Sequence, residues 1–127
     1  MKIKQANKYP LSYPQQAIWA HYKLFPKSLV YNLNGKSKIT GQINLSALKQ
    51  ACQKLIQRHN QLQVVFKEEN GSPYQYRIKV NHNIFKYTDL GTTTDRILDK
   101  YIKDEVQKPF DLEHGPLLKI ILFTYNT

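Results

Sequence analysis

Four histidines and a single cysteine are the side chains of this 127-residue sequence best suited to nucleophilic, acid–base or metal chemistry. Metal sites commonly use short spacings between such groups, as in His-x-x-x-His or paired cysteines. Here no two histidines are closer than 23 residues, and the cysteine has no second thiol as a partner. We therefore predict no metal site, no directly bound cofactor and no catalytic residue in this sequence. The five side chains are His21, His59, His82, His114 and Cys52.

Other common catalytic patterns are also missing from the sequence. Cys52 lies on the apolar side of an expected helix, which favours a buried, inert thiol over a nucleophile. The glycines at 35, 41, 71, 91 and 115 are isolated, so there is no glycine-rich phosphate loop. There is no G-x-S-x-G nucleophile elbow either. These local patterns assign no reaction to the chain.

The charge is strongly basic, with 19 Lys and Arg residues against nine Asp and Glu, a formal net charge of +10. A nucleic-acid footprint usually gathers on one face, but the lysines are spread from Lys2 to Lys119. We predict a solubilising surface and no nucleic-acid partner, and leave docking of an acidic protein open. The sequence has no signal-peptide core and no apolar run near the roughly 20 residues that cross a bilayer. We expect a cytoplasmic chain without a membrane partner.

Helix signals divide the sequence into regular elements. Ser12 and Gln15 fit a capping box, with Pro14 in the first helical turn. Asn44 can cap a second helix, whose apolar stripe includes Cys52 and ends at His59. The three expected helices run from Ser12 to Pro26, from Asn44 to Asn60, and from Thr92 or Thr93 to Pro109.

The segments between the helices have the composition and alternation of strands. The turn residues Glu69–Pro73 should connect the second extended segment to the third as a hairpin. The final apolar segment would normally have neighbours on both sides, so we expect another chain or a continuation of this one to cover it. Residues 1–9 are expected to form a loose arm. The expected extended segments are Leu29–Thr40, Leu62–Lys67, Tyr74–Val80, Asn83–Tyr87 and Leu117–Tyr125.

Four stretches carry a longer pattern. They are Pro10–Trp19 (continued by P-x-S-x-x-Y-N at 26–32), Ile39–Leu48, Arg58–Phe66 and Pro109–Leu118. In order and approximate spacing they resemble the condensation domains of nonribosomal peptide synthetases, over roughly residues 9–124. The family-motif positions to which the resemblance assigns structural roles are Ser12, Gln15, Gln16, Trp19, Tyr31, Asn32, Arg58, His59, Phe66, Pro109, Phe110, Asp111, Gly115 and Pro116.

The resemblance implies a fold and an activity. The fold would be α+β, part of a chloramphenicol-acetyltransferase-like lobe with about three helices and five to six strands, the helices packed on a mixed sheet. Residues 1–127 would form a single incomplete domain. The whole domain would form amide bonds between acyl or aminoacyl thioesters, whose phosphopantetheine arms belong to carrier proteins. Its partners would be those carriers and the rest of the condensation domain or synthetase.

The sequence departs from the family in ways that bear on activity. The family's active-site motif, His-His-x-x-x-Asp-Gly, is not present, so we expect the chain to be inactive alone. Ala17, Asn60 and Gln63 stand where the family usually has Arg, Glu and Arg. The alternatives are a module that docks a carrier or partner through an open strand edge, and part of an acyl-CoA-dependent acyltransferase.

We expect individual roles for four of the motif residues. Trp19 and Tyr31 should be aromatics of the core or of a lobe interface. Arg58 is expected to brace a neighbouring loop through charge-assisted hydrogen bonds. His59 is expected to be a structural, hydrogen-bonded histidine at the end of a helix.

Overall fold

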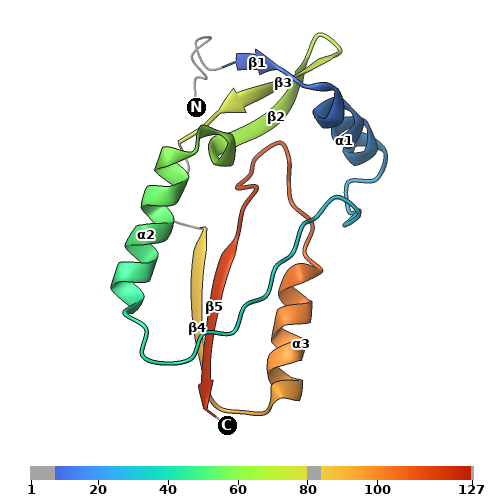
Figure 1. Cartoon of the computed structure of the whole chain (residues 1–127). Coiled ribbons are helices and arrows are strands. Elements are labelled where there is room, and N and C mark those ends of the chain that lie inside the picture. Colours follow the sequence, from blue (N-terminus) through green and yellow to red (C-terminus); the bar gives the residue numbers. More distant parts are fainter. Residues whose placement is uncertain (1–7, 80–83, 127) are drawn as a thin grey trace.

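A computed structural model describes residues 8–79 and 84–126. These residues contain three α-helices and five strands, in two sheets (Figure 1). Helices α2 and α3 stand on either side of the pair β4–β5, and α1 lies beside the upper, three-stranded sheet. The α+β class with three helices and five strands is confirmed, and the strands divide between one antiparallel and one parallel sheet.

Helix α1 (Tyr13–Leu24) begins as the sequence predicts. The Gln15 side chain accepts a hydrogen bond from the Ser12 backbone N–H at 2.9 Å, and the Ser12 hydroxyl accepts one from the Gln15 N–H. This capping box satisfies two N–H groups that a helix start leaves without partners. Trp19 is buried on the inner face, whereas Phe25, directly after the helix, is 58% exposed.

Helix α2 (Leu45–Arg58) is capped by Asn44, whose side chain accepts a hydrogen bond from Ala47 N–H at 2.9 Å. Cys52 and Ile56 are buried, in agreement with the predicted apolar side. Helix η2, a 3₁₀ turn at Asn60–Gln63, follows directly, so the strand predicted from Leu62 starts at Val64 instead. The buried Gln63 amide donates to Ile56 O at 3.0 Å, which satisfies a carbonyl near the end of α2.

The upper sheet has the order β1–β3–β2, from β1 (Lys8–Pro10), β2 (Val64–Glu69) and β3 (Ser72–Arg77). The predicted hairpin is confirmed, because β2 and β3 pair antiparallel around Asn70-Gly71, both with positive φ. A two-residue turn with left-handed backbone matches the twist of the strands. Opposite one another in this register, Val65 and Tyr76 are 1% and 2% exposed and form the centre of the core.

Strand β1 corrects the prediction of a loose arm over residues 1–9. Lys8 and Tyr9 pair with β3, and the Lys8 ammonium makes an ion pair with Glu69, which also accepts a hydrogen bond from the Tyr76 hydroxyl. A strand of three residues is too short to produce a recognisable alternation, so its partners alone define it. The remainder of the arm, residues 1–7, lies outside the described residues.

The lower sheet is a parallel pair, β4 (Phe85–Thr92) and β5 (Ile120–Asn126), connected through helix α3 (Asp95–Val106). Parallel neighbours require such a crossover. Strand β4 extends to Thr92, past the predicted end at Tyr87, and α3 therefore begins at Asp95, after Thr94. Residues 29–40, predicted to be extended, form neither helix nor strand, and the chain after Tyr31 crosses in front of the lower sheet (Figure 1).

Candidate functional site

Two groups of family-motif positions, far apart in sequence, meet beside strand β2. Phe66 N–H donates a hydrogen bond to Leu112 O at 2.8 Å, which attaches residues 109–116 to the free edge of β2. On the other side, the Tyr22 hydroxyl of α1 donates to Asp111 Oδ1 at 3.3 Å. We call Trp19, Tyr22, Phe66, Asp111 and Gly115, which α1, β2 and this segment bring to one end of the molecule, the motif junction.

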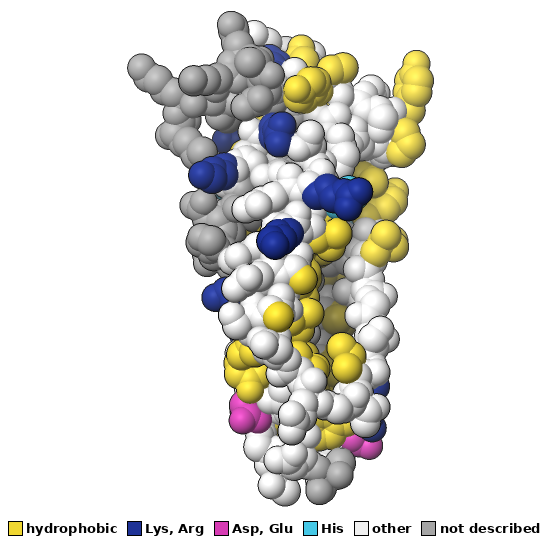
Figure 2. All heavy atoms as spheres, turned by 60° about the vertical axis from the view of Figure 1, so that its left-hand side comes forward, with side chains coloured by type: hydrophobic (Ala, Val, Ile, Leu, Met, Phe, Trp, Pro, Cys, Tyr) yellow, Lys and Arg dark blue, Asp and Glu magenta, His cyan; other side chains and the backbone are white. Residues whose placement is uncertain are grey.

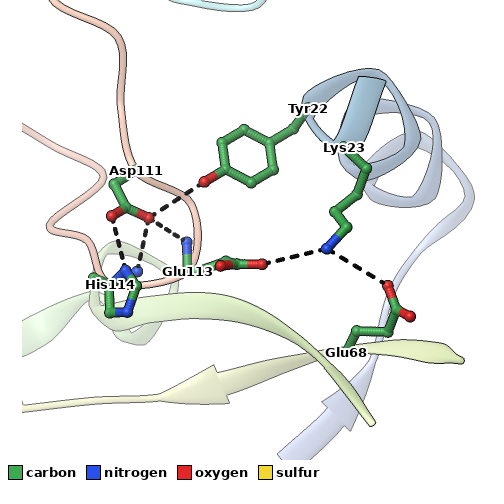
Figure 3. A network of polar contacts seen from close by, with 6 residues as sticks. All are labelled: Tyr22, Lys23, Glu68, Asp111, Glu113 and His114. Atoms are coloured by element: carbon green, nitrogen blue, oxygen red, sulfur yellow. Dashed lines mark hydrogen bonds and ion pairs between the residues drawn. The ribbon is translucent and has the colours of Figure 1, made fainter. Parts of the chain in front are cut away.

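Asp111 organises the turn at this junction (Figure 3). Its Oδ1 accepts hydrogen bonds from the backbone N–H groups of Glu113 and His114, at 2.9 and 3.1 Å. Its Oδ2 lies 2.8 Å from Nδ1 of the exposed His114 ring. An aspartate that bonds its own backbone two and three residues on is a common turn-forming device. Asp111 therefore shapes the turn and attaches it to α1 through Tyr22.

The surroundings of Asp111 favour the ionised form of its carboxylate, which is the form that accepts these hydrogen bonds. Partial burial would raise the pKa of Asp111, but the hydrogen bonds from His114 and the backbone outweigh it and hold this pKa below its usual value. The pKa of the Tyr22 phenol is raised, first by burial and then by the negative charges of Asp111 and Glu113. Tyr22 thus remains a neutral hydrogen-bond donor at physiological pH.

Lys23 links α1 to the same region through charge. Its ammonium lies 3.9 Å from Glu68 and 3.6 Å from Glu113 (Figure 3), and 5.3 Å from the ring of the buried Trp19. Ion pairs this exposed contribute little individually. Their effect is to orient α1, whose main anchor is Trp19.

The junction holds chain segments in place and contains no reactive grouping of its own. Both carboxylate oxygens of Asp111 are engaged in the turn. Across residues 8–79 and 84–126, no cluster of three or more His, Cys, Asp or Glu side chains is placed to bind a metal ion. The arrangement therefore supports positioning of the chain rather than proton transfer or metal chemistry.

A groove of about 1380 Å³ separates residues 31–43 from α3 and β5. Its lining mixes polar and apolar side chains, and the apolar ones include Ile18, Ile39, Ile102, Ile121 and Phe123. An ion pair between Lys36 and Asp99, at 2.9 Å, spans the groove and attaches the crossing segment to α3. The apolar side chains in a groove of this size are suited to contact further polypeptide or an acyl chain.

Glu105 connects the wall of the groove to its surroundings. It is 12% exposed and makes ion pairs with Lys86 of β4 at 2.6 Å and with Lys108 at 2.8 Å. The hydrogen bonds from Lys108 and Lys86 lower the pKa of Glu105 to about 2, against the opposing effect of burial. Glu105 thus holds the end of α3 against β4.

The lowered pKa of Glu105 makes a prediction about pH. Because the folded-state pKa lies below the unfolded value, the ion pairs contribute stability above about pH 4.5, and this contribution is lost as the pH falls toward 2. We expect Glu105→Gln to lower the free energy of unfolding by about 1 kcal/mol at pH 7, since solvent screens both lysines. Urea unfolding at pH 7 and pH 2 measures the difference, which should be much smaller at pH 2, where the Glu105 carboxylate is partly protonated in the folded state. An equal difference at both pH values would contradict the assignment.

The motif residues of α1 and its following turn are placed as follows. Ser12 and Gln15 form the helix cap, and the Gln16 side chain donates to Leu11 O at 3.2 Å. Tyr31 is half exposed and stands edge-on to the His21 ring, with centroids 5.3 Å apart. Asn32 closes a turn by donating its N–H to Leu29 O at 2.9 Å.

The motif residues of the segment 109–116 have separate positions. Pro109 is exposed just after α3, and the Phe110 ring lies 5.1 Å below the Lys119 ammonium. Gly115 has a φ of +65° and donates its N–H to Asp111 O at 2.8 Å, and the bond from Gly115 to Pro116 is cis. The segment therefore folds back toward β2.

Among the described residues, the Arg58 and His59 side chains do not make the contacts predicted for them. Both side chains are exposed, and within the described residues neither makes a hydrogen bond or ion pair. His59 acts through its backbone, whose N–H donates to Leu55 O at 3.1 Å. The corner between α2 and β2 is held by the neutral amide of Gln63, at a position where the family usually has a charge.

The sequence analysis assigned no role at this junction to Tyr22, Lys23, Glu113 or His114. One signal could have found the turn, because an aspartate with a glycine four residues later, as at Asp111 and Gly115, is typical of a turn. No local signal pairs Tyr22 with Asp111, which lies 89 residues further on.

Comparison with known proteins decides the family. The family model described as "Condensation domain" matches residues 5–127. The chain belongs to the condensation-domain family. It is 31% identical over 117 residues to a phosphinothricin tripeptide synthetase of Streptomyces viridochromogenes, an alignment of 89% of this chain and 11% of that protein. It is also 31% identical over 118 residues to bacitracin synthase 2 of Bacillus licheniformis, across 91% of this chain and 4% of the synthase.

Solved structures agree with this assignment. The starter condensation domain of rhizomide synthetase has a TM-score of 0.82 and 27% identity, over 91% of this chain and 30% of the solved one. The epimerization domain from the third module of tyrocidine synthetase B shares the fold, with a TM-score of 0.68 and 22% identity over 93% of this chain and 26% of that one. This condensation-domain chain thus corresponds to the N-terminal part of a domain about three times its length. None of the helices in the described residues is both long and apolar enough to span a membrane.

Proposed function

We propose that this chain is part of a condensation domain that forms amide bonds in nonribosomal peptide synthesis. The observation that carries the proposal is the family match over residues 5–127, together with relatives that are peptide synthetases. These relatives favour amide formation over the acyl-CoA-dependent alternative. The activity belongs to the whole domain, of which this chain supplies the motif junction and both walls of the groove.

The proposed reaction joins two carrier-bound groups. The amine nitrogen of one aminoacyl group attacks the thioester carbonyl carbon of the other, the carbon–sulfur bond breaks, and the amine proton leaves to a base while the thiolate is released. The phosphopantetheine arms that present both groups belong to the carriers. Positioning of two tethered reactants supplies much of the rate enhancement in a reaction of this kind.

The proposed contribution of this chain is structural support of the reacting domain. Its groove along β5 and α3 would receive the remainder of the condensation domain, which would supply the proton-handling histidine. Two features support this: the apolar side chains in the lining of the groove, and the 30% share of a solved condensation domain that the chain spans.

A chimera tests the proposal. The equivalent segment of the rhizomide starter condensation domain is replaced by these 127 residues, and product formation with loaded carriers is measured by mass spectrometry. We expect the folded chimera to retain activity within about tenfold of the parent domain, and the purified 127-residue chain to give none above background.

Two results would contradict the proposal. One is amide formation by the 127-residue chain alone. The other is a chimera that folds, shown by its circular dichroism and cooperative melting, but gives product at the background level. Carriers without acyl groups serve as the control for signal unrelated to condensation.

A further inference from the structure

The charges of this chain are segregated along the sequence. Residues 1–67 contain eleven Lys and Arg residues and no Asp or Glu. Residues 68–127 contain the other eight basic residues and all nine acidic ones. Although lysines occur along the whole chain, residues 1–67 contain no acidic residue that could neutralise the positive charge of their neighbours in sequence.

Folding neutralises some of these cations and leaves others unpaired. Lys8, Lys23 and Lys36 make ion pairs with carboxylates of the second half. The basic residues of α2 do not: among the described residues, Lys49, Lys54 and Arg58 have no ion-pair partner, and all are exposed. Lys54 and Arg58 are the two that lie one helical turn apart. Helix α2 has no acidic residue in its sequence. The positive charge of α2 is therefore available to a partner.

The two cations lie on the outer side of α2. Lys54 is two residues from both Cys52 and Ile56, the buried residues, which places it about 160° around the helix from each of them. Arg58 follows Lys54 at i+4 and shares its side. Leu55, between them in sequence, is 47% exposed. Lys54, Leu55 and Arg58 define a surface that we call the α2 basic face.

The end of strand β3 extends this positive region. The bond from Ile78 N–H to Gln63 O, at 2.8 Å, brings β3 beside the turn that follows α2. On either side of Ile78, Arg77 and Lys79 are exposed. In the view that brings α2 forward, Lys and Arg side chains gather over the upper part, and Asp and Glu side chains are seen only near the lower end (Figure 2).

We infer that the α2 basic face is a docking surface for an acidic amphipathic helix of a partner protein. Charge complementarity supplies the attraction, because two cations one helical turn apart match carboxylates at the same spacing. The exposed Leu55 favours a protein partner over a nucleic acid. An apolar side chain between the cations can pack against apolar side chains of a protein, whereas a phosphate backbone offers it no such contact. The inference is independent of the condensation activity.

The test is a binding titration of the whole 127-residue chain. The probe is a fluorescein-labelled 20-residue peptide designed as an amphipathic helix of Glu, Ala and Leu, followed by fluorescence anisotropy at low and moderate salt. We expect Lys54→Gln/Arg58→Gln to weaken binding at least tenfold. The matched control Arg96→Gln/Lys100→Gln removes one Arg and one Lys at the same spacing from α3, where both are exposed, and should change affinity less than twofold.

Two further measurements distinguish binding at a specific docking surface from nonspecific attraction between opposite charges. Leu55→Gln should weaken binding of the peptide about fivefold and leave binding of a 20-base-pair DNA duplex unchanged. A scrambled peptide of equal composition should bind at least fivefold more weakly than the designed helix.

Four outcomes would overturn the inference. They are absence of peptide binding, equal losses for the α2 and α3 variants, equal binding of the scrambled peptide, and tighter binding of the duplex than of the peptide. The last outcome would identify a nucleic-acid surface instead.

Discussion

Replacing Trp19 with alanine is expected to lower the free energy of unfolding by about 3–5 kcal/mol, because the change empties a large volume in a packed interior. The Trp19 side chain is only 5% exposed, its ring centroid lies 5.7 Å from that of Tyr22, and the Lys23 ammonium lies over its face. A domain of this size has a total stability of about 5–15 kcal/mol. Thermal unfolding followed by circular dichroism should show a midpoint about 10–20 °C lower.

Tyr13 provides a control within the same helix. It is the first residue of α1 and is 88% exposed, so Tyr13→Ala should change the free energy of unfolding by less than about 0.5 kcal/mol. Trp19→Phe, which keeps an aromatic ring, should fall between the two. Equal midpoints for Trp19→Ala and Tyr13→Ala would show that Trp19 is not a core residue of the folded chain.

Replacing Gly115 with alanine is expected to destabilise the motif junction by about 2 kcal/mol. Its φ of +65° is in the left-handed region, which costs a residue with a Cβ about 1 kcal/mol. In addition, a Cβ at this position would meet Val65 Cγ1 at 3.0 Å. Val65 is 1% exposed, so it has no free space into which to move. Urea unfolding of both proteins measures the difference.

Gly71 separates the cost of the left-handed backbone from the cost of the close contact, because it has a similar φ but free space around an added Cβ. Gly71 has a φ of +78°, and a Cβ there would meet nothing within 4 Å, so Gly71→Ala should cost only about 1 kcal/mol. In a Val65→Ala background, Gly115→Ala should cost about 1 kcal/mol less than in the wild type. The close contact would be disproved by a Gly115→Ala cost no larger than that of Gly71→Ala.

Local interactions account for the features that the sequence predicted well. The capping box of Ser12 and Gln15 and the cap at Asn44 are each complete within four residues. Likewise, the Asn70-Gly71 turn needs only two residues that tolerate positive φ. Helical spacing placed Trp19 and Cys52 on buried faces. Such features depend on neighbours in the chain, so a single sequence contains the information for them.

The family assignment had a different source. No single residue or spacing in the sequence indicates amide formation, and the prediction rested on four motifs in a familiar order. The family match over residues 5–127 confirmed it. A physical interpretation can now be added for two motif positions: Asp111 shapes a turn, and Gly115 permits close approach to Val65.

By itself, the sequence determined where the first two helices begin, where the hairpin turns, which helix faces are apolar, and to which family the chain belongs. Only the tertiary structure decided that Lys8 and Tyr9 join a sheet, that Tyr22 meets Asp111, and that Arg58 and His59 remain exposed. The physical reason is distance along the chain. A cap or turn forms among neighbouring residues, whereas these contacts depend on which distant segments pack together, and that choice is made by the burial of the whole core.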